Sequence, residues 1–401
     1  MKSPPCRFLV HRTARAPLHR AFRACVKPAG KPRGKPAFLD RQDGCRTGKG
    51  SLVHEPEKNA KRSRATLADV AKKAGVSLAT VDRVLNERGL YSAATQDRVL
   101  AAARSLGLRR ILPARHLKNL HVEVILTRPD LPLNQRFGDE FEALNQLTGK
   151  LVTIHRSFLR NDDPLLLARR IRETACDGIV VNVEAHPEIH RAVHDASGRG
   201  KAVVTIMSDL PRSARLAYAG IDHLSAGRSA AFFMAKMSPR PGGVVVLCNH
   251  LGYQGHRDRV RGFLDSLDQH GAGLDVAAVV EGQDDPDISE RKLRRVLGER
   301  PDIVGIYNTG AANRAVAAVI RSGVLAQPPV FIGHELTPFT RTALRDGTMT
   351  LAIDQSPELQ ARLAVDILMR HFGILDAEEK SVPLRPEVPF VLFGPENLPN
   401  R

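Results

Sequence analysis

The segment 77–86, SLATVDRVLN, carries polar side chains whose spacing indicates a specific chemistry. If the segment is a helix, its outward residues are Ser77, Leu78, Ala79, Thr80, Arg83 and Asn86. The hydroxyls of Ser77 and Thr80 can reach phosphates, and Arg83 can bond a guanine edge or a phosphate. Asn86 can do similar work nearer the helix end, while the two apolar side chains can contact a thymine methyl. This face predicts binding to DNA.

The stretch 65–107 contains the elements that would position this face. Three apolar runs fall at helical spacing: Leu67, Val70, Ala71 and Ala74; Val81, Val84 and Leu85; Val99, Ala102, Ala103 and Leu106. Gly75 favours a left-handed turn after the first run, and Gly107 follows the third. Ser77 and Ser92 can cap the second and third helices. The pattern predicts a helix-turn-helix, and the alternative is an ordinary three-helix cluster that binds nothing.

From residue 122 onward, apolar runs of strand length alternate with amphipathic helical stretches. The expected strands are 122–126, 151–154, 178–183, 202–206, 244–249, 276–281, 303–307, 329–333 and 349–353. This alternation indicates parallel sheets that are covered by helices on both faces. Two such series predict an α/β body of two doubly wound parallel-sheet lobes behind an all-α head. Such a body binds ligands beyond the carboxyl ends of its strands, in the cleft between the lobes.

Residues that follow the expected strands are therefore candidates for a small-molecule site. The candidates are Asn134, Phe137, Asp209, Arg257, Asn308, Glu335 and Gln355. Carboxylate, amide and guanidinium groups can hydrogen-bond the hydroxyls of a sugar, and one aromatic ring can stack on its C–H face. Each residue taken alone can equally be a loop residue or a helix cap. Their shared place at strand ends is what favours a binding site.

The run DVAKKAGVSLATVDRVLN at 69–86 resembles the N-terminal signature of the LacI/GalR family of bacterial transcriptional regulators. That signature is close to DVAxxAGVSxxTVSRVLN, and almost every fixed position matches. Asp82 is a departure, because most members have Ser there. An acid on the DNA-facing helix repels phosphate. We therefore expect Asp82 to point away from the DNA backbone or to pair with a nearby Arg.

The resemblance extends to the body, which looks like the ribose-type periplasmic binding protein fold of LacI/GalR sensors. It implies that Arg257, five residues before Gly262, binds ligand oxygens. It also implies that Asp209, Glu335 and Gln355 lie near the ligand. Glu335 stands where that fold usually has Asp, which lengthens one arm of the pocket.

Residues 108–121 are expected to connect the head to the body. In the family, a short hinge helix here orders on operator DNA and pushes a Leu into the minor groove. Leu117 resembles that Leu. Two departures, Leu108 in place of Tyr and a more distant Pro113, leave Leu120 as an alternative. A plain basic linker is a further alternative.

Positive charge is concentrated near the N-terminus of this 401-residue chain, whose formal net charge is +17. Residues 1–64 hold 17 Lys/Arg and 4 Asp/Glu, and residues 65–118 hold 10 and 4. Residues 119–401 hold 33 Lys/Arg and 35 Asp/Glu, so the body is close to neutral. This distribution is expected of a DNA-binding head on a neutral sensor body.

Residues 1–64 are rich in Arg, Lys, Pro and Gly and lack periodicity, so we expect them to be disordered. They can be a basic tail that adds DNA affinity, a targeting peptide, or the product of an over-extended start site. The last interpretation is favoured, because chains of the family begin a few residues before the TLADV run. We expect the effector-binding domain to span 122–396.

Several classes of protein are disfavoured by the sequence. Five scattered cysteines show no metal-ligand or redox spacing, and no apolar run is long enough to span a bilayer. A phosphate loop, a GxSxG motif, a dinucleotide fingerprint and an HExxH motif are all missing from the sequence, which indicates neither a cofactor nor catalysis. The alternatives to a regulator are a solute-binding protein, which leaves residues 65–107 unexplained, and a doubly wound α/β enzyme.

The combined pattern predicts a cytoplasmic transcriptional regulator, acting as a repressor under the control of a small-molecule effector. The expected effector is a sugar, a polyol or a sugar acid. One head makes too few contacts for operator affinity, so we expect a homodimer on near-palindromic operator DNA.

Overall fold

The computed structural model describes residues 66–86, 88, 91–106, 119–149, 151–249, 251–283, 285–375 and 388–399. These residues belong to two compact units, a head that ends before residue 118 and a body that follows it. Leu117, most of the expected hinge and the basic segment 1–64 lie outside the described residues.

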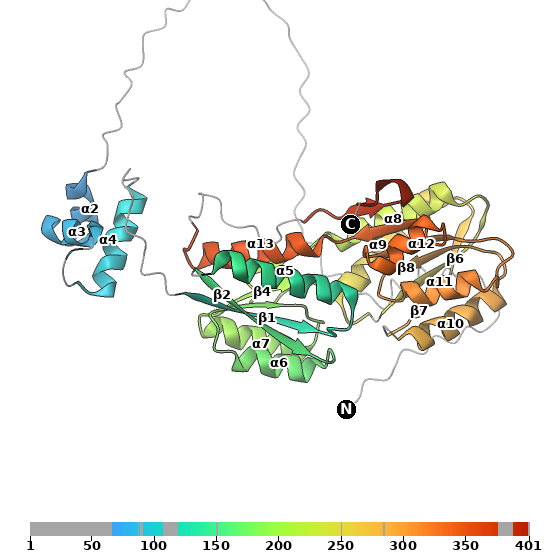
Figure 1. Cartoon of the computed structure of the whole chain (residues 1–401), viewed down its shortest axis with the longest axis horizontal. Helices are drawn as coiled ribbons and strands as arrows, with labels where there is room; N and C mark the ends of the chain where they lie inside the picture. The colour runs from blue at the N-terminus through green and yellow to red at the C-terminus, as the bar shows by residue number, and fades with distance from the viewer. Residues whose placement is uncertain are drawn as a thin grey trace, which may run out of the picture. The chain divides into compact units, whose positions relative to one another are not determined.

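The head contains the helices α2 (Leu67–Ala74), α3 (Leu78–Leu85) and α4 (Ala93–Ser105), which are labelled in Figure 1. Thr66 caps α2, since its side chain accepts from the backbone N–H of Asp69 while the Asp69 carboxylate accepts from the backbone N–H of Thr66. Gly75 ends α2 with φ 65°, the left-handed conformation expected of it. Ser77 caps α3 by accepting from the backbone N–H of Thr80. Helix, glycine turn and capped helix therefore follow one another as predicted.

A single apolar core holds the three helices of the head together. Its buried members are Val70, Ala71, Ala74, Val81, Val84, Leu85, Val99, Leu100, Ala102 and Ala103. Leu67 and Leu106 pack against this core while remaining partly exposed. Leu100 is the one buried member that helical spacing did not identify.

The first lobe of the body is a parallel five-stranded sheet with the order β2-β1-β3-β4-β5. Its strands are β1 (Leu120–Thr127), β2 (Val152–Leu159), β3 (Gly178–Val181), β4 (Ala202–Ile206) and β5 (Ala217–Ala219). The helices α6 (Pro164–Glu173) and α7 (Pro187–Gly198) cover one face, and α5 (Pro132–Thr148) and α13 (Pro357–His371) cover the other (Figure 1). The central strands β3 and β4 are buried on both faces, which explains their uninterrupted apolar sequences.

The second lobe is a six-stranded sheet with the order β11-β10-β9-β8-β6-β7. Five strands are parallel: β6 (Gly242–Cys248), β7 (Leu274–Glu281), β8 (Ile303–Asn308), β9 (Val330–His334) and β10 (Leu351–Asp354). The short β11 (Val391–Phe393) joins β10 in the antiparallel direction. One apolar core underlies α8 (His223–Met237) and α9 (Gln254–His270), and a second underlies α10 (Pro286–Glu299), α11 (Asn313–Arg321) and α12 (Pro338–Arg345).

Both lobes share one strand order, in which the first parallel strand lies between the second and the third. Successive strands are therefore added first on one side and then on the other side of β1 in the first lobe, and of β6 in the second. Ligands bind at the carboxyl ends of the strands at such switch points. The expected pair of doubly wound parallel-sheet lobes is confirmed. The sequence did not predict that α13, which follows a strand of the second lobe, covers the sheet of the first.

Candidate functional site

The exposed surface of α3 carries the residues predicted to contact DNA. Exposed side chains are those of Ser77, Leu78, Ala79 and Arg83, and half-buried ones are those of Thr80 and Asn86. The Arg83 guanidinium donates to the Ala79 carbonyl at 3.4 Å and to the Thr80 hydroxyl at 3.5 Å. Both contacts are long, so they hold the guanidinium weakly and leave it able to bind another partner.

Asp82 lies on α3 and accepts a hydrogen bond from Asn86 Nδ2 at 2.7 Å. Among the residues that the structure describes, Asp82 pairs with this amide and with no arginine, so of the two alternatives expected for Asp82 the arginine pair is not found. The reason is helix geometry, since residues four apart lie on the same face and Asn86 is one turn away. The amide of Asn86 is therefore partly committed to the protein.

A cavity of about 570 Å³ lies between the two lobes of the body, at the carboxyl ends of their strands. Its size is typical of a small-molecule site. Lining residues from the first lobe include Thr127, Asn134, Asn182 and Ser208, and those from the second include Asn249, Arg259, Thr309, His334, Glu335 and Gln355. Both topological switch points thus contribute polar side chains to one cavity.

Three residues at the cavity hold a backbone conformation that is rare for side-chain-bearing residues. Arg128, Met207 and Glu335 have φ of 48°, 56° and 73°, and each follows a strand of the body. Such conformations persist only where the surroundings impose them, and they gather at ligand clamps and switch regions. Their presence in the cavity wall favours a site shaped for binding.

Arg259 on α9 is a buried cation at the cavity, with 5% of its surface exposed. Its Nε donates to His223 Nδ1 at 3.1 Å, and its Nη1 donates to the Thr309 carbonyl at 2.7 Å. Burial, and then the charge of Arg259, lower the pKa of His223 well below its usual range, so this ring is neutral. Its Nε2–H therefore donates to the Met207 carbonyl at 2.5 Å, which leaves Nδ1 to accept from Arg259. The two partners hold the guanidinium in one orientation.

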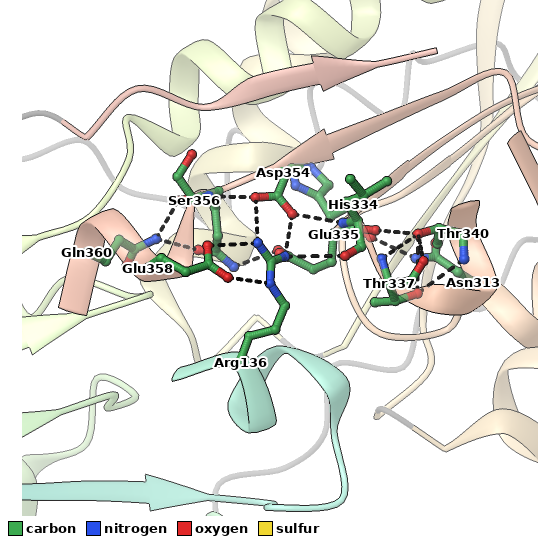
Figure 2. Close-up of polar contacts among 12 residues, drawn as sticks. Arg136, Asn313, His334, Glu335, Thr337, Thr340, Asp354, Ser356, Glu358 and Gln360 are labelled. Carbon is green, nitrogen blue, oxygen red and sulfur yellow. Dashed lines mark hydrogen bonds and ion pairs between the residues drawn. The ribbon is translucent and has the colours of Figure 1, made fainter. Parts of the chain in front are cut away.

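His334 and Glu335 stand at the end of β9, where Figure 2 shows them beside Asp354. His334 Nε2 contacts the Tyr307 hydroxyl at 2.9 Å, and Glu335 Oε1 accepts from Gln355 Nε2 at 2.6 Å. Burial, and then the charge of Asp354, raise the pKa of Glu335 to about 8. The remaining atoms, His334 Nδ1 and Glu335 Oε2, are buried without a hydrogen-bond partner. Buried polar atoms that lack a partner at a cavity are atoms that a bound ligand can satisfy.

Arg136 joins the two lobes beside the cavity. It extends from α5 in the first lobe toward the end of β10 in the second, as Figure 2 shows. Its guanidinium donates to both carboxylate oxygens of Asp354, at 2.5 and 3.3 Å, and to both of Glu358, at 2.8 and 2.9 Å. Asp354 also accepts from the backbone N–H groups of Leu336 and Ser356. The end of β10, next to Gln355, is therefore held from both lobes.

Two other kinds of site are missing from the part of the chain that the structure describes. It contains no group of three or more His, Cys, Asp or Glu side chains placed to hold a metal ion. It also contains no helix with the length and apolar character needed to cross a bilayer.

Comparison with known proteins accounts for both units. Residues 66–110 match the family described as bacterial regulatory proteins, lacI family, and residues 166–374 match the periplasmic binding protein domain. The chain belongs to the LacI family of bacterial transcriptional regulators. It is 25% identical to the regulator GalR of Escherichia coli (strain K12), over 65% of this chain and 76% of that one. It is 26% identical to GalR of Salmonella typhimurium (strain LT2), over 75% of this chain and 90% of that one.

Solved structures resemble the body of this LacI-family chain. A glucose-galactose binding protein, GanP of Geobacillus stearothermophilus, superposes with a TM-score of 0.64 at 23% identity, over 70% of this chain and 99% of that one. A solute-binding protein of Burkholderia graminis in complex with D-arabinose superposes with a TM-score of 0.64 at 20% identity, over 71% of this chain and 98% of that one. At these identities the likeness shows the fold alone.

Three of the residues that the sequence placed in the effector site line the cavity of this LacI-family body: Asn134, Glu335 and Gln355. Asn134 also holds the turn after β1, because its Nδ2 donates to the carbonyls of Thr127 and Arg128. Their contact with an effector stays a prediction.

Phe137, Asp209 and Asn308 do not line this cavity, and each side chain has partners within the protein. Phe137 faces the core of the first lobe, where its ring stacks on that of Phe141. Asp209 forms an ion pair with Arg215, and both side chains are buried. Asn308 donates to Asn313 Oδ1 at 2.7 Å and so shapes the loop behind the cavity wall. Each was chosen because it follows an expected strand, but its side chain packs against or bonds groups of the protein itself.

Arg257 is also outside the cavity, and Arg259 takes the place assigned to it. Two residues apart on a helix lie about 200° apart around its axis, so the two side chains point in opposite directions. Arg257 instead donates to the Gly252 carbonyl at 2.9 Å and to Gln254 Oε1 at 2.8 Å. The signal that sequence reasoning missed is the spacing of Gly255, Arg259 and Gly262, which share one face of α9. That face packs closely on α8, because a Cβ at Gly262 would lie 2.1 Å from the Leu224 carbonyl oxygen.

Proposed function

We propose that this chain is a DNA-binding transcriptional repressor whose operator affinity is set by a polar small molecule in the cavity between the lobes. The observation that carries the proposal is that one chain joins the exposed face of α3 to a body whose cavity takes polar side chains from both switch points. Among its relatives, PurR of Photobacterium profundum is named a transcriptional repressor.

The expected effector is a sugar, a polyol or a sugar acid. Amide, imidazole, carboxyl and guanidinium groups line the cavity and can hydrogen-bond several hydroxyls at once. The solved structures that resemble the body include proteins described with D-arabinose and D-allose bound. We assign no catalysis to this cavity.

The expected target is near-palindromic operator DNA, bound by a homodimer in the cytoplasm. The single helix α3 offers few side chains to base edges, and specific sites need more contacts than one head supplies. Two heads related by a two-fold axis would read the two halves of one operator.

Control of DNA binding requires the effector to favour one arrangement of the lobes. Ligand groups that touch both walls stabilise the closed arrangement, and a coupling of about 1–3 kcal/mol changes operator affinity about 5- to 150-fold. Arg136 is placed to respond to this arrangement, because from α5 in the first lobe it bonds Asp354 at the end of β10 in the second lobe.

The test uses the full chain and DNA selected from a random pool by repeated binding. We expect the selected sites to be near-palindromic and their affinity to change when an effector is added. Arg83→Ala should lose the selected DNA while Arg257→Ala, outside both sites, retains it. A monomer with no sequence preference would contradict the proposal.

A further inference from the structure

We infer that the effector carries a carboxylate, which Arg259, His334 and Glu335 bind on the second-lobe side of the cavity. This inference rests on the proposed function, because it names the class of molecule that the same cavity would sense.

Arg259 lacks a negative partner in the described part of the chain. Its Nε and Nη1 bond a neutral imidazole and a backbone carbonyl, and its Nη2 makes no hydrogen bond to the described residues. The other arginines at the cavity are differently placed, since Arg128 pairs with Asp130 and the exposed Arg314 lies over the Phe339 ring. A buried cation is costly unless an anion compensates its charge. An anionic ligand group would supply that charge.

His334 adds a second unmet donor. Tyr307 is fully buried, and its hydroxyl has His334 Nε2 as its partner at 2.9 Å. A buried hydroxyl donates where it has one acceptor, so Nε2 accepts and the ring proton of the neutral imidazole sits on Nδ1. Burial keeps this ring neutral by lowering its pKa well below the usual range. Nδ1–H is buried and has no acceptor.

Glu335 adds a third hydrogen-bond donor without an acceptor. The Gln355 amide donates to Oε1, and Oε2 has no partner. With its pKa raised to about 8 by burial and by Asp354, the carboxyl group is protonated at neutral pH and its Oε2–H is a donor. Three donors from α9 and the end of β9 therefore lack acceptors.

A carboxylate can accept hydrogen bonds from the donors of Arg259, His334 and Glu335, because it offers two oxygens with about four acceptor positions. It also brings one negative charge. A neutral sugar would leave the charge of Arg259 uncompensated, and a phosphate dianion would exceed it. The first lobe contributes Asn182 Oδ1, a buried acceptor without a partner, which a ligand hydroxyl can satisfy. The occupant that fits both walls is a polyhydroxy monocarboxylate.

Calorimetric titration of the full chain tests the inference with matched probes. The acids are D-gluconate and D-galacturonate, their neutral counterparts are D-glucitol and D-galactose, and the phosphate ester is D-glucose 6-phosphate. We expect at least one acid to bind about 10- to 150-fold more tightly than its neutral counterpart, as for hydrogen bonds to a charged group. Tighter binding of the neutral counterparts or of the phosphate ester, or no binding of either acid, overturns the inference.

Two variants separate the contributions. Arg259→Gln should lose the preference for the acid, whereas Arg257→Gln on the same helix should keep it. Because Arg259 also holds Thr309 and His223, its loss can unfold the lobe, so Glu335→Gln is the second variant. An amide keeps a donor, so this variant should bind the acid as tightly as the wild type at pH 7. A loss of more than about tenfold would mean that Glu335 acts as a charged acceptor, and would overturn the assignment.

The same titrations distinguish this inference from the proposed function. A neutral sugar that binds tightly and changes operator affinity would keep the regulator and overturn the carboxylate. An acid that binds tightly without changing operator affinity would support the carboxylate and contradict the proposed control.

Discussion

Replacing Arg136 with Met should destabilise the body far more than the loss of an ordinary surface ion pair. Met keeps much of the length of the side chain but removes the guanidinium that bonds Asp354 and Glu358. The Asp354 side chain is only 5% exposed, so its carboxylate would be left buried without its cation.

The magnitude follows from what remains around each carboxylate. Removal of one partner of a buried ion pair costs about 3–5 kcal/mol. Asp354 keeps its bonds from the Leu336 and Ser356 backbone N–H groups, at 2.9 and 2.8 Å, which favours the lower end. Glu358 is 38% exposed, so solvent screens its share to about 0–1 kcal/mol. We expect a total of about 3 kcal/mol.

The chain provides a matched control in Arg362, which also links α13 to α5. Its Nε donates to Glu140 Oε1 at 2.6 Å, but the arginine is 60% exposed. Arg362→Met should therefore cost less than about 1 kcal/mol. Since the chain contains no tryptophan, scanning calorimetry and circular dichroism are the suitable assays.

A double variant tests the cause of the effect. Asp354→Asn removes the stranded charge, so Arg136→Met with Asp354→Asn should be more stable than the sum of the single changes implies, by about 1–3 kcal/mol. The reasoning would be refuted if Arg136→Met cost no more than Arg362→Met, or if the two changes were additive.

Three further predictions concern the head, the pH response and the packing of α9. Arg83→Ala should lower operator affinity about 10- to 150-fold in a fluorescence anisotropy titration, because the guanidinium is the main polar group of α3 that can contact base edges. Effector binding should stay unchanged. Equal operator affinity would show that Arg83 does not contact the DNA. The pKa of Glu335 rises from 4.5 to about 8 on folding through burial and Asp354, with Arg259, Arg136 and Gln355 acting in the opposite direction. Between these two pKa values the folded state keeps a proton on Glu335 that the unfolded state releases. The contribution of Glu335 to the unfolding free energy is therefore full below pH 4.5 and is lost as the pH rises to about 8. Calorimetric scans of Glu335→Gln should show less of this decline, and an identical pH profile would refute the assignment. Gly262→Ala should cost about 1–3 kcal/mol, since its Cβ meets the Leu224 carbonyl oxygen at 2.1 Å, whereas Gly298→Ala has nothing within 4 Å and should not destabilise α10; equal melting temperatures would contradict the close packing of α8 on α9.

The fold could be predicted from the sequence wherever local patterns and burial agree. Apolar runs such as those of β3 and β4 exist because these strands are covered on both faces, so periodicity identified them. The head was equally readable, since Gly75, Ser77 and the apolar stripes act over one or two turns. The placement of α13 could not be predicted, because the helix packs on a sheet whose last strand ends far earlier in the chain, at Ala219. Local sequence carries no signal for a partner at that distance.

The site was only partly predictable, and the reason is visible at Arg257 and Arg259. Both follow β6 and both carry the same guanidinium, so residue type and strand position do not separate them. Their difference lies in the rotation of α9, which is fixed by the approach of Gly227, Gly255 and Gly262 to their neighbours. Once that rotation is fixed, Arg259 meets His223 and the Thr309 carbonyl, while Arg257 bonds the loop that precedes its own helix. The selectivity of the cavity is therefore determined by the packing of one helix as much as by the polar residues at its strand ends. A change in the packing of α8 on α9 should alter effector preference without changing any residue that touches the effector.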